Sequence, residues 1–255
     1  MRELIAFDCA GETLAGTVDR APGRTGLLIV SGGNEIRTGA HRGMAALAQR
    51  VAAAGHPVFR YDRRGIGDST GANGGFENSG PDIAAAADAF RDAAGVERIV
   101  AFGNCDSATA LALFHGSAGI YALVLANPWT IEATADAPAD LPPPAAIRAR
   151  YAAKLKDPRE LWRLVSGGVN LGKVLRGLRR SRQTAPRGLA DRLGAALAGA
   201  DAPISVLIAR GDNTAVAFRA ALPSIAVLER DTDSHSFAAP GDADWLCERI
   251  VEKLG

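Results

Sequence analysis

The stretch "VAFGNCDSATALALF", from Val100 to Phe114, decides the fold. Its first residues form a short apolar run typical of a buried strand, and the residues after Cys105 have the pattern of a helix. Gly103 and Ser107 lie two positions before and two positions after Cys105. A sharp turn from strand to helix needs small residues there, because larger side chains would collide. The stretch therefore predicts a turn that exposes the Cys105 side chain, although a buried cysteine at a strand end is the common alternative.

Further apolar runs along the chain predict more strands of the same sheet. Each run is bounded by Gly, Pro or Asp, and β-branched residues are frequent in most of them. An alternating pair of segments around Ala10-Gly11 predicts an antiparallel hairpin before them. The buried strands are predicted at residues 26–32, 57–62, 98–104, 121–127, 203–211 and 224–231.

Segments with helical patterns lie between these strands. In "HRGMAALAQRVAAAG" (41–55), apolar residues recur at the spacing that gives a helix one apolar face. In "PDIAAAADAFRDAAG" (81–95), a proline stands where the first turn of a helix accepts it. The alternation of strand and helix predicts the α/β fold class, with a mostly parallel central sheet and helices on both faces.

Composition excludes several classes of function. The 255 residues carry a formal net charge of +1, which gives no indication of a nucleic-acid partner. No apolar run has the length of a signal peptide or of the roughly 20-residue span that crosses a bilayer, so we expect a cytoplasmic protein without stable membrane insertion. Three cysteines without C-x-x-C spacing argue against a disulfide framework and a zinc site, and we expect neither metal nor cofactor.

The alternation breaks once, in a long segment between two predicted core strands. The segment opens with a Pro-rich stretch and continues as basic sequence, with 13 Lys or Arg against 6 Asp or Glu from residue 130 to residue 200. A connection of this length predicts a cap over the sheet. Its basic excess fits either a solvated helix face or a surface that receives an anionic carrier. The expected organisation is a core at 1–128, a cap or lid insertion at 129–202, and the rest of the core at 203–255.

Two later residues extend the pattern around Cys105. Asp212 in "ARGDNTA" follows one late strand, and His235 in "SHSF" follows the next. The chain order of nucleophile, acid and histidine is that of an α/β-hydrolase. The glycine-rich "LIVSGGN" follows an early strand, where its free N–H groups would help to form an oxyanion hole. All four features stand at carboxyl ends of strands, where open α/β sheets build their sites.

On these residues the chain resembles the α/β-hydrolase superfamily, from Gly26 to the C-terminus. It is most similar to the hydrolases associated with exosortase A systems of exopolysaccharide-producing bacteria, in the family called hydrolase 1. The motifs that carry the resemblance are "SGGNEIRTGAHR", "YDRRGIGDSTG", "FGNCDSA", "ARGDNTA" and "SHSF". The resemblance implies an α/β-hydrolase fold with a helical cap, a nucleophile at Cys105, an acid at Asp212 and a histidine at His235. Most superfamily members have serine at the nucleophile position, and dienelactone-hydrolase-like enzymes have cysteine.

The three residues would divide the chemistry of acyl transfer among them. Cys105 would attack an acyl carbonyl as a thiolate, which a helix N-terminus and a protonated His235 both favour. His235 would then protonate the leaving group and activate water. Asp212 would hold the imidazole in the useful tautomer. Asp233, two residues before the histidine, is a rival for the role of the acid.

Further residues are expected around this triad. The segment "YDRRGIGDS" (61–69) is interpreted as a tight turn braced by an Asp–Arg pair, in preference to a substrate-binding loop. The expected oxyanion-hole residues are Gly33 and Asp106, through their backbone N–H groups, with Asn34 as a substitute for the first. The expected substrate-binding residues are Glu35, Arg37 and Trp129.

The sequence thus predicts an enzyme that hydrolyses an ester or thioester through a covalent acyl-cysteine intermediate. Its substrate would be a small-molecule or carrier-linked acyl group. Because an acyl-cysteine exchanges readily with alcohols and thiols, an acyltransferase using the same triad is one alternative. A non-catalytic binding protein on the hydrolase fold is another, since the cysteine replaces the more usual serine.

Overall fold

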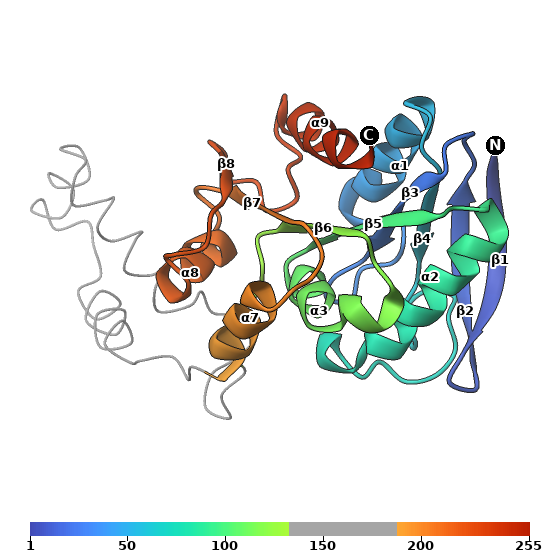
Figure 1. Ribbon diagram of the computed structural model, residues 1–255, viewed down its shortest axis with the longest axis horizontal. Coiled ribbons are helices and arrows are strands. Elements are labelled where there is room, and N and C mark those ends of the chain that lie inside the picture. The colour runs from blue at the N-terminus through green and yellow to red at the C-terminus, as the bar shows by residue number, and fades with distance from the viewer. Residues whose placement is uncertain (133–187) are drawn as a thin grey trace, which may run out of the picture.

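The computed structural model describes residues 1–132 and 188–255. Within these residues the chain forms an eight-stranded sheet of order β1-β2-β4-β3-β5-β6-β7-β8 (Figure 1). β1, β2 and β4 pair antiparallel, and the remaining neighbours pair parallel. The strands are β1 (Arg2–Cys9), β2 (Glu12–Asp19), β3 (Thr25–Val30), β4 (Val58–Tyr61), β5 (Arg98–Asn104), β6 (Ala122–Ala126), β7 (Ile204–Ala209) and β8 (Leu228–Arg230).

The predicted hairpin and strands are present with shifted ends, and the largest change of length is in the last strand. The strand predicted at 224–231 is reduced to β8, three residues at the edge of the sheet. It pairs with β7 only from Leu228 to Arg230, and its residues are exposed or half-buried. An apolar pattern alone does not show where pairing with the neighbouring strand stops.

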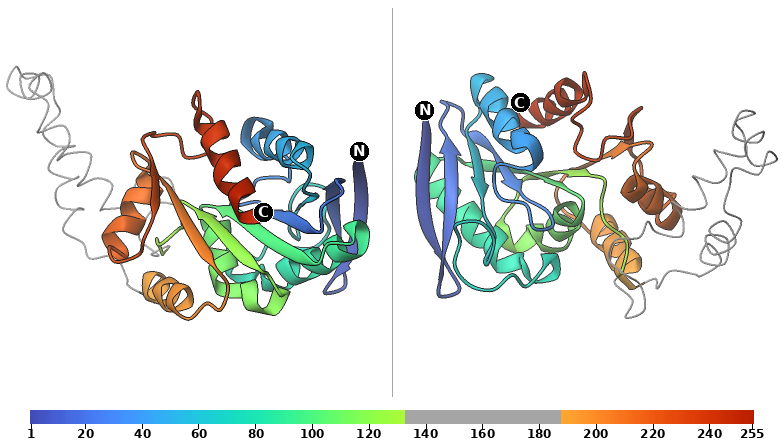
Figure 2. Two further views of the ribbon diagram at one scale, coloured as in Figure 1. Left: turned by 45° about the horizontal axis from the view of Figure 1, so that its top comes forward. Right: turned by 180° about the vertical axis from the view of Figure 1, so that it is seen from behind.

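Helices cover both faces of the sheet (Figures 1 and 2). α1 and α9 pack on one face, and α2, α3, α7 and α8 pack on the other. The α-helices are α1 (Gly43–Ala53), α2 (Gly80–Ala94), α3 (Asp106–Phe114), α7 (Gly188–Ala198), α8 (Asn213–Ala221) and α9 (Asp242–Leu254). Short 3-10 turns are η1 (Ala40–Arg42), η2 (Phe76–Asn78) and η3 (His115–Ala118).

The central strand β5 shows why the apolar runs are continuous rather than alternating. Ile99 and Ala101 belong to the core beneath α2 and α3, and Val100 and Phe102 belong to the core beneath α1 and α9. Successive side chains of a strand point to opposite faces, so a strand covered on both sides is apolar at every position. The buried sheet is therefore a rigid base whose carboxyl end carries the loops described next.

The predicted cap at 129–202 lies mostly outside the described residues and stays a prediction. Its described end is α7, which packs against α3 and contributes the fully buried Leu193 to the core. In the two described ranges, no helix is both long enough and apolar enough to cross a membrane.

Candidate active site

Cys105 occupies a sharp turn between β5 and α3. Its backbone has φ 65° and ψ −127°, a conformation that is rare for a residue with a side chain. The Cys105 N–H donates to the carbonyl of Ala126 at the end of β6, with 2.9 Å between N and O. A strained residue of this kind costs on the order of 1–3 kcal/mol and persists only where its surroundings hold it. The turn presents the half-buried thiol on the residue that directly precedes α3.

Gly103 and Ser107, the small residues on either side of Cys105, leave room for the sharp turn, as the sequence indicated. Ser107 also forms hydrogen bonds within the turn. A Cβ added to Gly103 would lie 2.8 Å from the carbonyl carbon of Ser107, so the backbone excludes any larger residue. The Ser107 hydroxyl accepts from the N–H of Asn104 at 3.0 Å and donates to its carbonyl at 2.8 Å. Ser107 is therefore small enough for the turn and also fixes it by hydrogen bonds.

Asp212 and His235 come together from two loops at the carboxyl ends of β7 and β8. Asp212 Oδ2 lies 3.0 Å from His235 Nδ1. The same oxygen caps α8, accepting from the N–H groups of Thr214 and Ala215 at 3.1 and 3.2 Å. Asp212 is only 8% exposed, so the carboxylate that orients the imidazole is itself fixed by a helix N-terminus.

Two hydrogen bonds raise the pKa of His235 to about 10. The bond to Asp212 has the larger effect and the bond to Cys105 has the next, while burial opposes both. The raised pKa favours the protonated imidazole, which contacts the Asp212 carboxylate and lines the same pocket as the Cys105 thiol. The rival acid, Asp233, lies against the backbone of Gly211. Among the described residues, His235 forms its ion pair with Asp212 and none with Asp233.

The loop after β3 forms a tight turn beside Cys105. Gly33 has φ 54°, and its N–H donates to Asp106 Oδ1 at 2.7 Å. The guanidinium of the buried Arg63 donates to the carbonyl of the same glycine. The expected substitute, Asn34, is exposed, and its Oδ1 accepts from Asn73 Nδ2 at 2.9 Å. The Gly33 peptide is therefore held on both sides, and its N–H already has a carboxylate acceptor.

A pocket of about 140 Å³ lies over the thiol, and one of the three expected substrate-binding side chains lines it. Arg37 lies instead on an ion-pair network, with Asp62 and Asp68 as its carboxylate partners. Trp129 lies against the turn, where its N–H donates to the Cys105 carbonyl at 3.2 Å and its indole Nε1 to Ile131. The pocket-lining residues are Val30, Ser31, Gly32, Gly33, Glu35, Met44, Asn104, Cys105 and His235.

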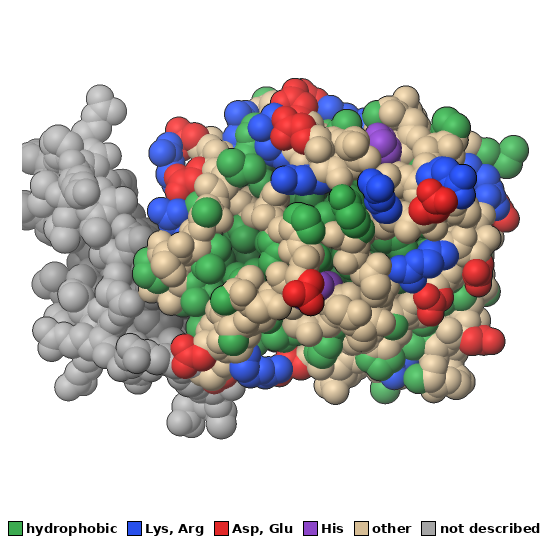
Figure 3. All heavy atoms as spheres, viewed as in Figure 1, with side chains coloured by type: hydrophobic (Ala, Val, Ile, Leu, Met, Phe, Trp, Pro, Cys, Tyr) green, Lys and Arg blue, Asp and Glu red, His purple; other side chains and the backbone are tan. Residues whose placement is uncertain are grey.

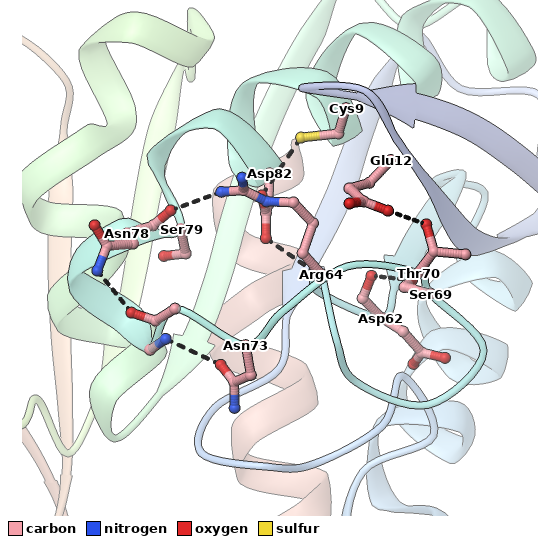
Figure 4. A network of polar contacts seen from close by, with 12 residues as sticks. Cys9, Glu12, Asp62, Arg64, Ser69, Thr70, Asn73, Asn78, Ser79 and Asp82 are labelled. Carbon is pink, nitrogen blue, oxygen red and sulfur yellow. Dashed lines mark hydrogen bonds and ion pairs between the residues drawn. The ribbon is translucent and has the colours of Figure 1, made fainter.

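The segment at 61–69 forms a braced turn, but the expected Asp–Arg pair is not formed within the segment. Its aspartate and its arginine each pair with a residue from another part of the chain. The fully buried Asp62 pairs with Arg37 from the loop after β3, and not with an arginine of its own segment. Arg64 pairs with Asp82 at the start of α2 (Figure 4). The Ser69 hydroxyl donates to the Asp62 carbonyl at 2.7 Å. These contacts attach the turn to α2 and to the loop beside the pocket.

Two asparagines complete the site, and the sequence analysis missed both. Asn104 ends β5 immediately before Cys105, and Asn127 follows β6. Their amides bond to each other and to the backbone of His235. The available signal was an amide at the carboxyl end of each of two neighbouring parallel strands.

The face of the molecule drawn in Figure 3 carries charges of both signs. On the face shown in Figure 3, Lys, Arg, Asp and Glu side chains are intermixed, and hydrophobic side chains gather over the region of α7 and α8. In the described part of the chain, no group of three or more His, Cys, Asp or Glu side chains is arranged to hold a metal ion.

The strand order, the antiparallel hairpin at one edge and the turn at Cys105 define an α/β-hydrolase fold. Solved structures with low sequence identity to this chain have the same fold. An esterase from Pyrococcus furiosus is 16% identical with a TM-score of 0.63, covering 100% of this chain and 90% of its own. DcsB in complex with a substrate analogue is 15% identical with a TM-score of 0.66, covering 100% and 99%. The thioesterase domain of the curacin biosynthetic pathway is 11% identical with a TM-score of 0.59, covering 100% and 99%.

At these identities the likeness establishes the fold and nothing finer. No family model and no curated protein matches the chain.

Proposed function

We propose that the protein is a cytoplasmic hydrolase that cleaves an ester or thioester through an acyl-cysteine intermediate on Cys105. One observation carries the proposal. The His235 ring lies 3.0 Å from the Asp212 carboxylate and lines the same pocket as Cys105. This placing supports an arrangement of nucleophile, proton carrier and orienting acid, which activates a nucleophile for acyl transfer.

The first half of the reaction forms the acyl-enzyme. The protonated His235 stabilises the thiolate of Cys105, whose sulfur attacks the acyl carbonyl and forms a C–S bond. The carbonyl electrons move onto oxygen and return as the bond to the leaving alcohol or thiol breaks. His235 donates its proton to that leaving group and becomes neutral.

The second half returns the enzyme to its starting state. The neutral His235 accepts a proton from water as the water oxygen attacks the thioester carbonyl. The C–S bond then breaks, the carboxylic acid leaves, and the thiolate again faces a protonated imidazole. Asp212 stays ionised throughout and stabilises the positive ring.

The proposed oxyanion donors are the backbone N–H groups of Asp106 and Gly33. Asp106 is the first residue of α3, so its N–H belongs to the positive end of a helix dipole. The N–H of Gly33 becomes a donor to substrate when the Asp106 carboxylate leaves it. Glu35 lines the pocket next to these groups and is the proposed contact for the substrate beyond the acyl carbon.

The substrate class rests on the motifs "SGGNE" and "YDRRGIGDS" together with the cysteine. They support an acyl group linked to an exopolysaccharide or to a carrier, as in the hydrolases associated with exosortase A systems. Transfer of the acyl group to a sugar hydroxyl instead of water uses the same intermediate. Adding a sugar acceptor to the assay distinguishes the two, because a transferase forms an acylated sugar.

The test measures hydrolysis of phenyl acetate and thiophenyl acetate by the wild-type protein and by Cys105→Ala and His235→Ala. We expect turnover by the wild type and its loss in both variants. Cys247→Ala is the matched control, since this buried cysteine lies in α9. Hydrolysis that survives in Cys105→Ala would overturn the proposal. Binding of the intact ester without turnover would favour the non-catalytic alternative.

A further inference from the structure

The side chain of Asn127 links the three loops that carry Cys105, Asp212 and His235. Asn127 directly follows β6 and is completely buried. Its Nδ2 donates to the carbonyl of His235 at 3.0 Å and to Asn104 Oδ1 at 3.1 Å. Its Oδ1 accepts from the N–H of Ala209 at 2.8 Å. The two N–H groups and the oxygen of this one amide therefore bond to three different segments of the chain.

Each of these bonds fixes a residue next to the triad. Asn104 directly precedes Cys105, and its own Nδ2 donates to the same His235 carbonyl at 3.1 Å. Ala209 ends β7, and its carbonyl accepts from the N–H of Asp212 at 3.0 Å. The His235 carbonyl thus receives two N–H donors, one from the residue before the nucleophile and one from Asn127.

The backbone bonds matter because the His235 ring is only partly buried. Its side chain is 41% exposed, whereas Asn127 is 0% exposed. The place of the ring depends on its hydrogen bonds and on where the backbone of its loop is fixed. A displacement of about 1 Å at a reacting group lowers a rate by as much as ~100-fold.

Asparagine fits this position in both side chain and backbone. Asn127 has φ 41°, in the left-handed region that asparagine tolerates better than most residues. An amide supplies two donors and an acceptor in one plane, whereas a carboxylate has no donor. A buried amide with its two N–H groups bonded avoids the desolvation penalty of an unpaired polar group.

We propose that Asn127 is a positioning residue of the catalytic site, which fixes the His235 backbone so that the imidazole reaches both Cys105 and Asp212. The inference rests on the proposed function, because it assigns Asn127 an effect on the reactivity of Cys105. A purely structural role would lower stability and leave that reactivity unchanged.

Two variants separate these roles. Asn127→Asp keeps the shape and the acceptor for the Ala209 N–H but removes both donors. Asn127→Gly removes the amide without backbone strain, since glycine adopts positive φ freely. Ser79→Ala is the control, because it removes the hydroxyl of another buried side chain, labelled in Figure 4. This hydroxyl donates to the Phe76 carbonyl at 2.6 Å before α2.

The readout is the rate of alkylation of Cys105 by iodoacetamide between pH 5 and pH 10, resolved by peptide mass spectrometry. Cys9 serves as an internal reference, since burial and the neighbouring Asp82 raise its pKa to about 11. We expect both Asn127 variants to label Cys105 about 10- to 100-fold more slowly than wild type at pH 7. Ser79→Ala should label at the wild-type rate even where its melting temperature falls.

Combination with His235→Ala shows whether Asn127 acts through the imidazole. If it does, adding Asn127→Asp or Asn127→Gly to His235→Ala slows labelling little further, because the effects of coupled residues are not additive. Folded Asn127 variants that label like wild type and keep the full effect of His235→Ala would overturn the inference. If Asn127→Asp does not fold, Asn127→Gly decides. Wild-type labelling that is insensitive to His235→Ala would instead contradict the proposed function, a separate outcome.

Discussion

The carboxylate of Asp106 accepts a hydrogen bond from the backbone N–H of Gly33, with 2.7 Å between Oδ1 and N. Gly33 is a proposed oxyanion donor, and Asp106 directly follows the nucleophile. In the resting protein the Asp106 carboxylate therefore occupies a donor that the proposed transition state would use. The carboxylate and a developing oxyanion repel each other, so both cannot use the same N–H.

Removing the charge of Asp106 should accelerate the reaction. Asp106→Asn keeps the size of the side chain and an oxygen that accepts from Gly33, but not the negative charge. We expect kcat/KM on a neutral ester to rise about three- to tenfold, which corresponds to ~1 kcal/mol in the barrier. Steady-state kinetics on phenyl acetate check this. An unchanged or lower kcat/KM would show that the carboxylate does not oppose the oxyanion.

Asp212 caps α8, and we propose that it also orients His235 in catalysis; substitutions can separate these two roles. Asn caps a helix about as well as Asp, so Asp212→Asn keeps the cap of α8 and loses the charge beside His235. We expect kcat to fall by at least ~100-fold, given the large losses that triads show for this change. Asp212→Ala should lose activity and also about 1 kcal/mol of stability through the missing cap.

Asp233→Asn is the control for the rival acid. Its carboxylate is not paired with His235 in the described structure, so kcat should stay close to wild type. Kinetics and denaturant unfolding of the three variants complete the comparison. A larger loss of kcat in Asp233→Asn than in Asp212→Asn would mean that Asp233, and not Asp212, is the acid that orients His235.

The raised pKa of His235 predicts how stability depends on pH. The folded-state pKa is about 10, and the ordinary value is 6.5. Below pH 6.5 the imidazole is charged in both states, and the folded state has the full benefit of the contacts with Asp212 and Cys105. Between pH 6.5 and 10 the unfolded chain releases the proton first, so this benefit decreases. The difference in melting temperature between wild type and His235→Ala should therefore shrink from pH 7 to pH 10. A constant or growing difference would contradict this.

A buried ion pair under the loop after β3 should dominate the stability of that region. Arg60 is 2% exposed, and it donates to Asp19 at 3.3 Å and to the Arg37 carbonyl at 2.8 Å. Burial lowers the pKa of Arg60, which nevertheless stays charged and needs its partner. Asp19→Ala should reduce the free energy of unfolding by about 3–5 kcal/mol. Urea unfolding measures this, and a loss below ~1 kcal/mol would mean that water replaces the carboxylate.

Much of the fold follows from the sequence because both faces of the sheet are covered. A parallel strand such as β5 is then apolar at every position, and a run such as 98–104 is visible without an alignment. The end of β8 was not predictable, because it depends on where pairing with β7 stops. The cap at 129–202 lies mostly outside the described residues and stays a prediction.

The positions of the candidate site residues were predictable where a residue type implies its chemistry, and their catalytic roles stay proposals. Cys105, Asp212 and His235 follow strands in the order that the hydrolase fold requires, and the structure brings Asp212 and His235 to 3.0 Å. Arg37 and Trp129 were assigned to the substrate from position alone, whereas the Arg37 guanidinium bonds to Thr17 on β2 and the Trp129 indole donates to the nearby Ile131 carbonyl. The partners of the Arg37 guanidinium come from distant segments, and no local pattern encodes them. The contacts of Asn104 and Asn127 could not be predicted either, because their partners also lie far away in the sequence.

The acyl-enzyme itself provides the most direct test of the account. The protein is mixed with excess phenyl acetate, quenched in acid within the first turnover, and mapped by peptide mass spectrometry. The account predicts one acetyl group on Cys105, and a longer-lived adduct in His235→Ala if that variant acylates. Hydrolysis at the wild-type rate with no acetyl group on Cys105, or with the acetyl group on another residue, would contradict it.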